Sequence, residues 1–296
     1  MMRKVRIITD SCSDLPKELR EKYDIGYALM NTVKDGKETP ASLDWEYFTP
    51  HDFYEQMRNG ERFTTTMVPE AEFEKVFRPI LEQGCDIVYI ACSGKLSGSV
   101  NSGAMVAERL KKEFPDATIH SIDSLNASVG EGSVAIRAAR LRDEGKSADE
   151  IRAELEPVRN NVNQFVTVHN LNALKAAGRV TGSSAFFGNL LGVKPIIISD
   201  KVGNNVPIKK VKGRLNSLEE IVNLLAEGVE GEEAPEVFVV HADCEDEAKE
   251  VAELVEKKIP GAKTYITYIG PIIGASIGAD AIGVFAFGKS IERFAQ

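Results

Sequence analysis

The sequence predicts an α/β protein of two domains: an α/β/α layer with a mostly parallel sheet, then a domain with a mixed sheet and helices. Three observations carry this prediction. The chain has 296 residues, which suits two domains of ordinary size. Its first half alternates short β-branched runs with helical patterns, and its second half is richer in strands. The polar residues 159–161 separate the halves, so we expect domains 1–158 and 159–296.

In the first domain, short apolar or alternating runs rich in β-branched residues predict strands at 5–9, 86–90 and 117–121. Helical patterns lie between and after them. Pro16 stands near one helix start, and Thr49 with Pro50 predicts another. Further helices are expected at 69–83, 99–112 and 127–144. The turn Lys34-Asp35-Gly36-Lys37 predicts a hairpin over 26–39.

A capping box formed by Ser147 and Glu150 predicts one more helix before the boundary. Beyond it, Gly203-Asn204-Asn205 is typical of a turn in an antiparallel hairpin, and Ser217 is expected to open a helix. Strands are predicted at 164–168, 195–199, 206–211, 236–241, 263–269 and 282–287, and helices at 216–229 and 245–258.

The composition excludes several functional classes. Against 45 Asp and Glu residues the chain has 36 Lys and Arg, and the net charge of −9 disfavours nucleic-acid binding. No apolar run is long enough for a membrane span, and residues 1–10 do not form a signal peptide, so we expect a cytoplasmic protein. No cofactor or metal site is expected, because the four cysteines include no CxxC pair: Cys12, Cys85, Cys92 and Cys244.

Hydroxyl side chains gather where the predicted parallel strands end. The set comprises Thr9, Ser11, Thr64, Thr65, Thr66, Ser93, Ser97, Ser99, Ser124 and Ser128. Ligands of parallel sheets collect at this edge, and helix N-termini favour anions, so the site suits a phosphate or a carboxylate. The alternative is that these residues are ordinary helix caps and turn residues.

Motifs for catalysis are absent. Gly94-Lys95-Leu96 fails the P-loop pattern, and residues 94–98 fail the G-x-S-x-G pattern. None of the four histidines is an obvious general base. The segment His241-Ala-Asp243-Cys244 could supply a thiol nucleophile or metal ligands, or Asp243 could simply cap a helix. We therefore expect no enzyme; the alternative is a phosphotransfer or hydrolytic enzyme that uses the Ser/Thr-rich edge.

Two segments, 177–188 and 270–283, mix glycines with bulky apolar residues. Phe186, Ile272 and Ile273 could line an apolar slot, since glycine permits close approach of the backbone. Alternatively, both segments simply pack a core helix and a turn.

Several short segments also occur in the order typical of one family. They are 9–11, 14–16, 65–66, 93–99, 123–130, 178–180, 193–196 and 270–274, and they span nearly the whole chain. In this ordered set the chain resembles the DegV family. The resemblance implies two α/β domains with a long-chain fatty acid between them, its carboxylate held by hydroxyls and its tail buried. It also implies that some members present the acyl chain to a fatty-acid kinase for phospholipid synthesis, acting as carriers.

By position, the resemblance implies that Thr65 and Ser93 bind the carboxylate, with Thr66 adjacent and Arg179 near the head group or the kinase-facing surface. There are two departures: Gly94 stands where the family commonly has a second serine, and Ser276 stands in place of a histidine. The hydroxyl of Ser276 can donate a hydrogen bond but cannot carry charge. A basic run could dock an acidic partner or form a solvated face: Lys209, Lys210, Lys212 and Arg214.

Overall fold

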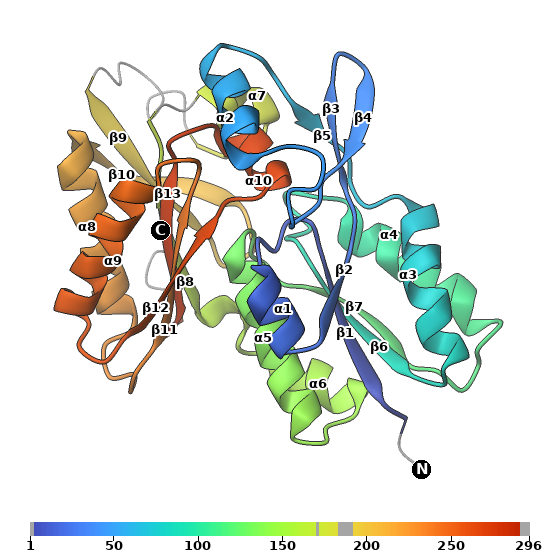
Figure 1. Ribbon diagram of the computed structural model, residues 1–296. Helices are drawn as coiled ribbons and strands as arrows, with labels where there is room; N and C mark the ends of the chain where they lie inside the picture. Colours follow the sequence, from blue (N-terminus) through green and yellow to red (C-terminus); the bar gives the residue numbers. More distant parts are fainter. Residues whose placement is uncertain (1–2, 170–171, 183–191, 291–296) are drawn as a thin grey trace.

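The computed structural model describes residues 3–169, 172–182 and 192–290 (Figure 1). It is an α/β structure with two main sheets, one parallel and one mixed, and this confirms the predicted fold class. In the described part of the chain, no helix is both long enough and apolar enough to cross a membrane.

The first sheet has the strand order β2-β1-β6-β7, and each pair of neighbours is parallel. The strands are β1 (Val5–Asp10), β2 (Ile25–Ala28), β6 (Asp86–Ala91) and β7 (Ile119–Asp123). Every residue of β6 is buried, as expected for a central strand covered on both faces.

Helices cover both faces of this sheet. Successive side chains of each strand point to opposite sides, so apolar side chains on each face pack against helices. Ile7 of β1 packs into one apolar cluster with α1 (Lys17–Lys22), α5 (Val129–Asp143) and α6 (Ala148–Leu155). Ile8 packs into another with α3 (Glu70–Glu82) and α4 (Ser99–Lys111). Figure 1 shows α3 and α4 on one side and α5 and α6 on the other.

A small antiparallel sheet stands above the parallel sheet in Figure 1. It contains β3 (Asn31–Lys34), β4 (Lys37–Pro40) and β5 (Thr64–Thr65). The turn at Asp35 and Gly36 has positive φ at both residues, 51° and 75°, which identifies the predicted two-residue hairpin turn. The hairpin is shorter than predicted, because β2 pairs with β1 in the parallel sheet instead. Helix α2 (Pro50–Arg58) begins as predicted with Thr49, whose hydroxyl accepts from Asp52 N.

The second sheet has six strands in the order β10-β9-β8-β13-β11-β12. It is mixed, because β11 and β12 are parallel and the other pairs are antiparallel. Its strands are β8 (Val162–Thr167), β9 (Val193–Ser199), β10 (Asn205–Lys212), β11 (Glu236–His241), β12 (Lys263–Tyr268) and β13 (Ile282–Phe287). Helices α8 (Arg214–Gly228) and α9 (Glu245–Lys258) cover its outer face (Figure 1).

Two predicted helix caps are wrong. Helix α8 begins at Arg214 after Gly213, and the Ser217 hydroxyl instead donates to the Arg214 carbonyl inside the helix. Gly213 has a φ of 85°, a backbone conformation that glycine adopts without strain. The helix therefore begins directly after Gly213, before Ser217 is reached. Cys244, and not Asp243, is the N-cap residue of α9. The Asp243 carboxylate is bound by Arg58 instead.

The inner face of the second sheet packs on α5 of the first half. Val166, Phe238 and Phe285 from this sheet share one buried apolar cluster with Val134 and Ala138 of α5. The predicted division into 1–158 and 159–296 falls between the two sheets and stays a prediction. Three short helices complete the fold: η1 (Arg159–Asn161), α7 (Asn172–Ala177) and α10 (Pro271–Ile277).

Candidate functional site

A mainly apolar pocket lies between the two halves of the chain. It holds about 830 Å³ of space, including the part open to solvent. Its apolar walls come from Met30 and Leu96 of the first half and from Val166, Ile197, Ile272 and Phe285 of the second. A ligand in this pocket would contact both sheets.

A second, more polar cavity adjoins the apolar pocket. The two share Thr65, Arg179, Ser276 and Ile277, so these four residues mark the junction between them. Arg58, Arg62 and His169 also line this outer cavity. The Arg58 guanidinium is already paired with the carboxylates of Asp243 and Asp280. The junction therefore joins an apolar interior to a polar mouth.

Six of the predicted site residues come together at the apolar pocket. They are Thr65, Thr66, Arg179, Ile272, Ile273 and Ser276. Ser93 and Gly94 are not among the residues that line it. Phe186 lies outside the described residues. The pocket thus gathers side chains that lie more than 200 positions apart in the chain.

The junction presents polar groups that can bind a ligand. Thr65 lies on β5, whose backbone pairs with β3, and Ser276 lies in α10. Among the described residues, neither hydroxyl has a hydrogen-bond partner, whereas Thr66 Oγ1 accepts from Asn31 N at 3.3 Å. Arg179 is exposed and donates to two backbone carbonyls, those of Leu96 and Ala177, but pairs with no described carboxylate. This arrangement suits an anion.

Ser93 is buried and holds a contact between the two halves. Its hydroxyl donates to the Gly203 carbonyl oxygen at 2.8 Å and accepts from Lys95 N at 3.2 Å. The approach is so close that a Cβ atom on Gly203 would lie 2.2 Å from Ser93 Oγ. Its predicted role in carboxylate binding stays a prediction, and it requires this hydroxyl to leave the Gly203 carbonyl.

Gly94 lies in the same loop, beside Asp123. Its backbone N–H donates to Asp123 Oδ2 at 3.2 Å, and a Cβ atom at this position would lie 2.9 Å from that oxygen. A serine here would have to displace the Asp123 carboxylate, which explains why glycine fits this chain.

Asp14 fastens α10, and with it one wall of the pocket, to the first half. Its carboxylate accepts from Gly270 N at 2.8 Å and from Ser128 Oγ at 2.6 Å. Burial raises the pKa of Asp14 to about 7, although both hydrogen bonds act in the opposite direction. Tyr54 makes a parallel link, donating to the Ile269 carbonyl at 2.5 Å. Sequence reasoning did not identify either residue as part of the site.

Sequence reasoning also missed Gln164, which lines the pocket from β8. Its Oε1 atom is buried without a hydrogen-bond partner. The two adjacent amides Asn163 and Gln164 at the start of a predicted strand were the signal that could have singled it out, because buried polar groups are normally paired.

The basic run is partly neutralised by acidic neighbours. Lys209 pairs with Glu220 at 2.8 Å, and Arg214 pairs with Glu247 at 2.8 Å. The Arg214 side chain is only 13% exposed. These pairs reduce the positive field that a docking surface would need.

The histidines are spread over the molecule. His51 contacts Asp243, and His120 contacts Asp149. His241 is buried, and burial lowers its pKa to about 4. His169 alone of the four lines the outer cavity. No described pair of a histidine and a hydroxyl forms a hydrogen bond that would activate a nucleophile.

Comparisons with known proteins agree with this architecture. A family model described as "Uncharacterised protein, DegV family" matches residues 4–289. A DegV domain-containing protein of Clostridium perfringens is 34% identical over 291 residues, covering 98% of this chain and all of the relative.

Solved structures are similar over almost the whole chain. One, described as fatty acid binding of a DegV family protein from Thermus thermophilus, matches with a TM-score of 0.86 and 28% identity, covering 97% of this chain and 100% of the other. A second, DegV, a fatty acid binding protein from Bacillus subtilis, has a TM-score of 0.85 and 28% identity, covering 98% and 100%. Both proteins bind fatty acids according to their descriptions.

Proposed function

Because this chain belongs to the DegV family, we propose that it binds a long-chain fatty acid in the apolar pocket between its two halves. The fatty-acid binding described for the Thermus thermophilus and Bacillus subtilis relatives supports this proposal. The carboxylate lies at the junction with the outer cavity, and the tail extends along the apolar walls.

The observation that carries the proposal is the set of residues shared by the two cavities. Thr65 and Ser276 bring free hydroxyls to the junction, and Arg179 brings a positive charge. Hydrogen bonds to a charged group contribute roughly 1.5–3 kcal/mol each. An amphipathic anion satisfies both sides of this junction, because its head stays near the polar cavity while its tail enters the apolar pocket.

The tail contributes more of the affinity than the head. Each buried methylene contributes about 0.8 kcal/mol, and a long chain carries many of them. We therefore expect affinity to rise steeply with chain length. Calorimetric titration of delipidated protein with octanoate and palmitate measures this directly, and equal affinities would refute a tail pocket.

Mass spectrometry of lipid extracted from the purified protein identifies the natural ligand, and recovery of no fatty acid from undelipidated protein would argue against the proposal.

We further propose that the protein is a cytoplasmic carrier without catalytic activity, which presents the acyl chain to a fatty-acid kinase for phospholipid synthesis. The supporting feature is the position of the junction, because a carboxylate there faces the outer cavity with Arg179 exposed beside it. Acyl-phosphate formation with an added kinase tests this role.

The alternative is a phosphotransfer or hydrolytic enzyme at the Ser/Thr-rich edge. Turnover of ester or phosphate substrates by the protein alone would favour that alternative.

A further inference from the structure

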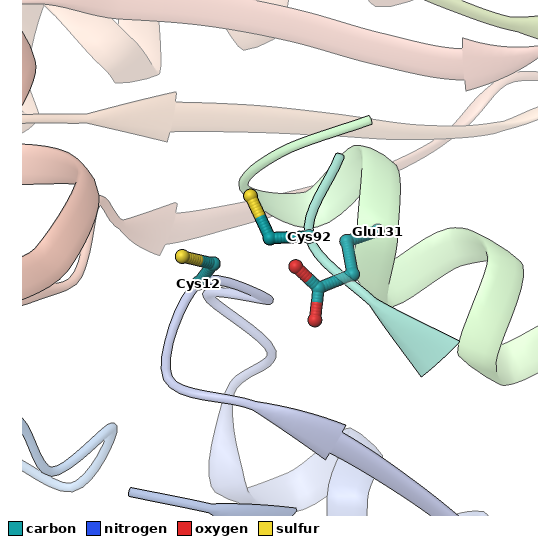
Figure 2. A group of neighbouring side chains, drawn as sticks. All are labelled: Cys12, Cys92 and Glu131. Atoms are coloured by element: carbon teal, nitrogen blue, oxygen red, sulfur yellow. The ribbon is translucent and has the colours of Figure 1, made fainter. Parts of the chain in front are cut away.

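Two cysteines and a glutamate form a buried cluster beside the apolar pocket. Cys12 follows β1, Cys92 follows β6, and Glu131 lies in the first turn of α5. Their sulfur and carboxylate ligand atoms all lie within 4.8 Å of one another. The cysteines are 80 positions apart, yet they meet because β1 and β6 are neighbours in the parallel sheet. Figure 2 shows the three side chains converging from separate elements.

Glu131 has an unused carboxylate oxygen. The side chain is fully buried, and its Oε1 atom accepts from Thr9 Oγ1 at 2.5 Å and from Asp10 N at 3.3 Å. Its Oε2 atom is buried and has no hydrogen-bond partner in the part of the chain that the structure describes. One oxygen of this carboxylate points towards the two sulfur atoms in Figure 2. A buried oxygen without a partner is costly, so this group calls for a ligand.

The two cysteines are held by one neighbouring side chain. The Asp10 carboxylate accepts from Cys12 N at 2.8 Å and from Cys92 N at 3.4 Å, and Tyr89 donates its hydroxyl to it at 2.6 Å. A further soft atom is present, because Met30 Sδ lies 3.4 Å from Cys12 Sγ. The Asp10 carboxylate therefore holds the backbone of both cysteines together.

The acidic groups of the cluster have no basic partner. Asp10 and Glu131 are buried together, and no lysine, arginine or histidine among the described residues is paired with either. A divalent cation would offset the charge of the deprotonated ligands. The N-terminus of α5 adds favourable positive potential for thiolates.

We propose that Cys12, Cys92 and Glu131 bind one Zn²⁺ ion, with Met30 beside the fourth position. Tetrahedral zinc has bonds of about 2.3 Å to sulfur and about 2.1 Å to oxygen, which place ligand atoms roughly 3.4–3.8 Å apart. The ligand atoms, which lie within 4.8 Å of one another, would move closer together on binding. On binding, two Zn–S bonds replace two S–H bonds, and the protons pass to the solvent without any redox change. Cys12, Met30 and Cys92 also line the apolar pocket, which gives the ion a path of entry.

Co²⁺ is the probe that reports the ligands directly. The delipidated full-length protein is reduced, freed of metal with a chelator and titrated with Co²⁺ without oxygen. We expect one equivalent to produce a thiolate-to-cobalt absorption band and the bands of tetrahedral cobalt. One equivalent of Zn²⁺ should then abolish both. Zinc addition to the apo-protein should release protons to the solvent, because thiols lose their protons when they bind the metal.

The variants Cys12→Ser and Cys92→Ser should lose the thiolate band or halve its intensity, and Glu131→Gln should weaken cobalt binding by about tenfold or more. Cys85→Ser is the matched control, because Cys85 is also buried but precedes β6, at the end of the strand remote from Cys92. This control should bind cobalt as the unaltered protein does.

Two results would each overturn the proposal. The first is the absence of a thiolate band at one equivalent in the unaltered protein, a measurement that does not depend on any variant folding. The second is equal binding by Glu131→Gln and the unaltered protein.

Discussion

Asp14 offers a sharp test of how burial and hydrogen bonding are balanced at the wall of the pocket. Its carboxyl group is 3% exposed and bridges Ser128 to Gly270, the residue that starts α10. Burial raises its pKa from 3.8 to about 7. The folded protein therefore holds this proton more tightly than the unfolded chain does. Between pH 4 and pH 7 the unfolding free energy should fall as the pH rises.

The magnitude follows from the pKa shift. One pKa unit corresponds to about 1.4 kcal/mol, so the contribution of Asp14 should decline by up to about 4 kcal/mol across this window. Below the unfolded pKa this contribution is fully present, and above the folded pKa it has been lost. The suitable variant is Asp14→Asn, because asparagine has the same shape, can still accept from Gly270 N, and tolerates the positive φ of 47° at this position.

Urea unfolding of both proteins at half-unit steps from pH 4 to pH 9 measures the difference. We expect the unaltered protein to lose stability relative to Asp14→Asn as the pH rises to 7, with little further change above pH 8. Taking the difference between the two proteins cancels the contributions of other titrating groups. A difference that stays constant across the whole range would refute the reasoning and would mean that Asp14 ionises normally in the folded state.

Three further predictions concern the head-group junction, the contact between the halves, and a buried histidine. The double variant Thr65→Val, Ser276→Ala should weaken palmitate binding by tenfold or more in calorimetry, since each lost hydrogen bond to a charged group is worth roughly 1.5–3 kcal/mol; unchanged affinity would remove both residues from the site. Gly203→Ala should lower the unfolding free energy by more than about 1 kcal/mol, because the position has a φ of 89° and the new Cβ would clash with Ser93; a thermal midpoint equal to that of the unaltered protein would contradict this. His241→Gln should lessen the loss of stability between pH 6.5 and pH 4, because burial lowers the histidine pKa to about 4 and the unfolded chain takes up the proton first; parallel pH profiles of the two proteins would count against it.

Local signals in the sequence were sufficient for most of the elements. The capping box of Ser147 and Glu150, the Thr49 cap and the Asp35-Gly36 turn all appear in the structure as predicted. Such signals involve residues within about four positions, so they can be read without knowing the tertiary structure. The cap predicted at Ser217 was wrong because a glycine at positive φ started the helix earlier.

The site residues also divide into those that the sequence indicated and those that depend on distant contacts. The ordered motifs indicated the family, and Thr65, Thr66, Arg179 and Ser276 do line one pocket. Their roles as ligand contacts stay predictions. The hydroxyl of Ser93 could not be placed from the sequence, because its partner is the Gly203 carbonyl, 110 positions further along the chain.

Hydrophobic periodicity, caps and turns are properties of neighbouring residues, and from these the sequence by itself determined the α/β class and the order of most strands and helices. Strand order within a sheet and the packing of one half against the other depend on contacts between residues far apart in the chain. The tertiary structure alone therefore decided that β1 lies beside β6, which brings Cys12 to Cys92 and Glu131. It also decided which face of each strand lines the pocket, because an alternating pattern identifies a buried side but not the element that covers it.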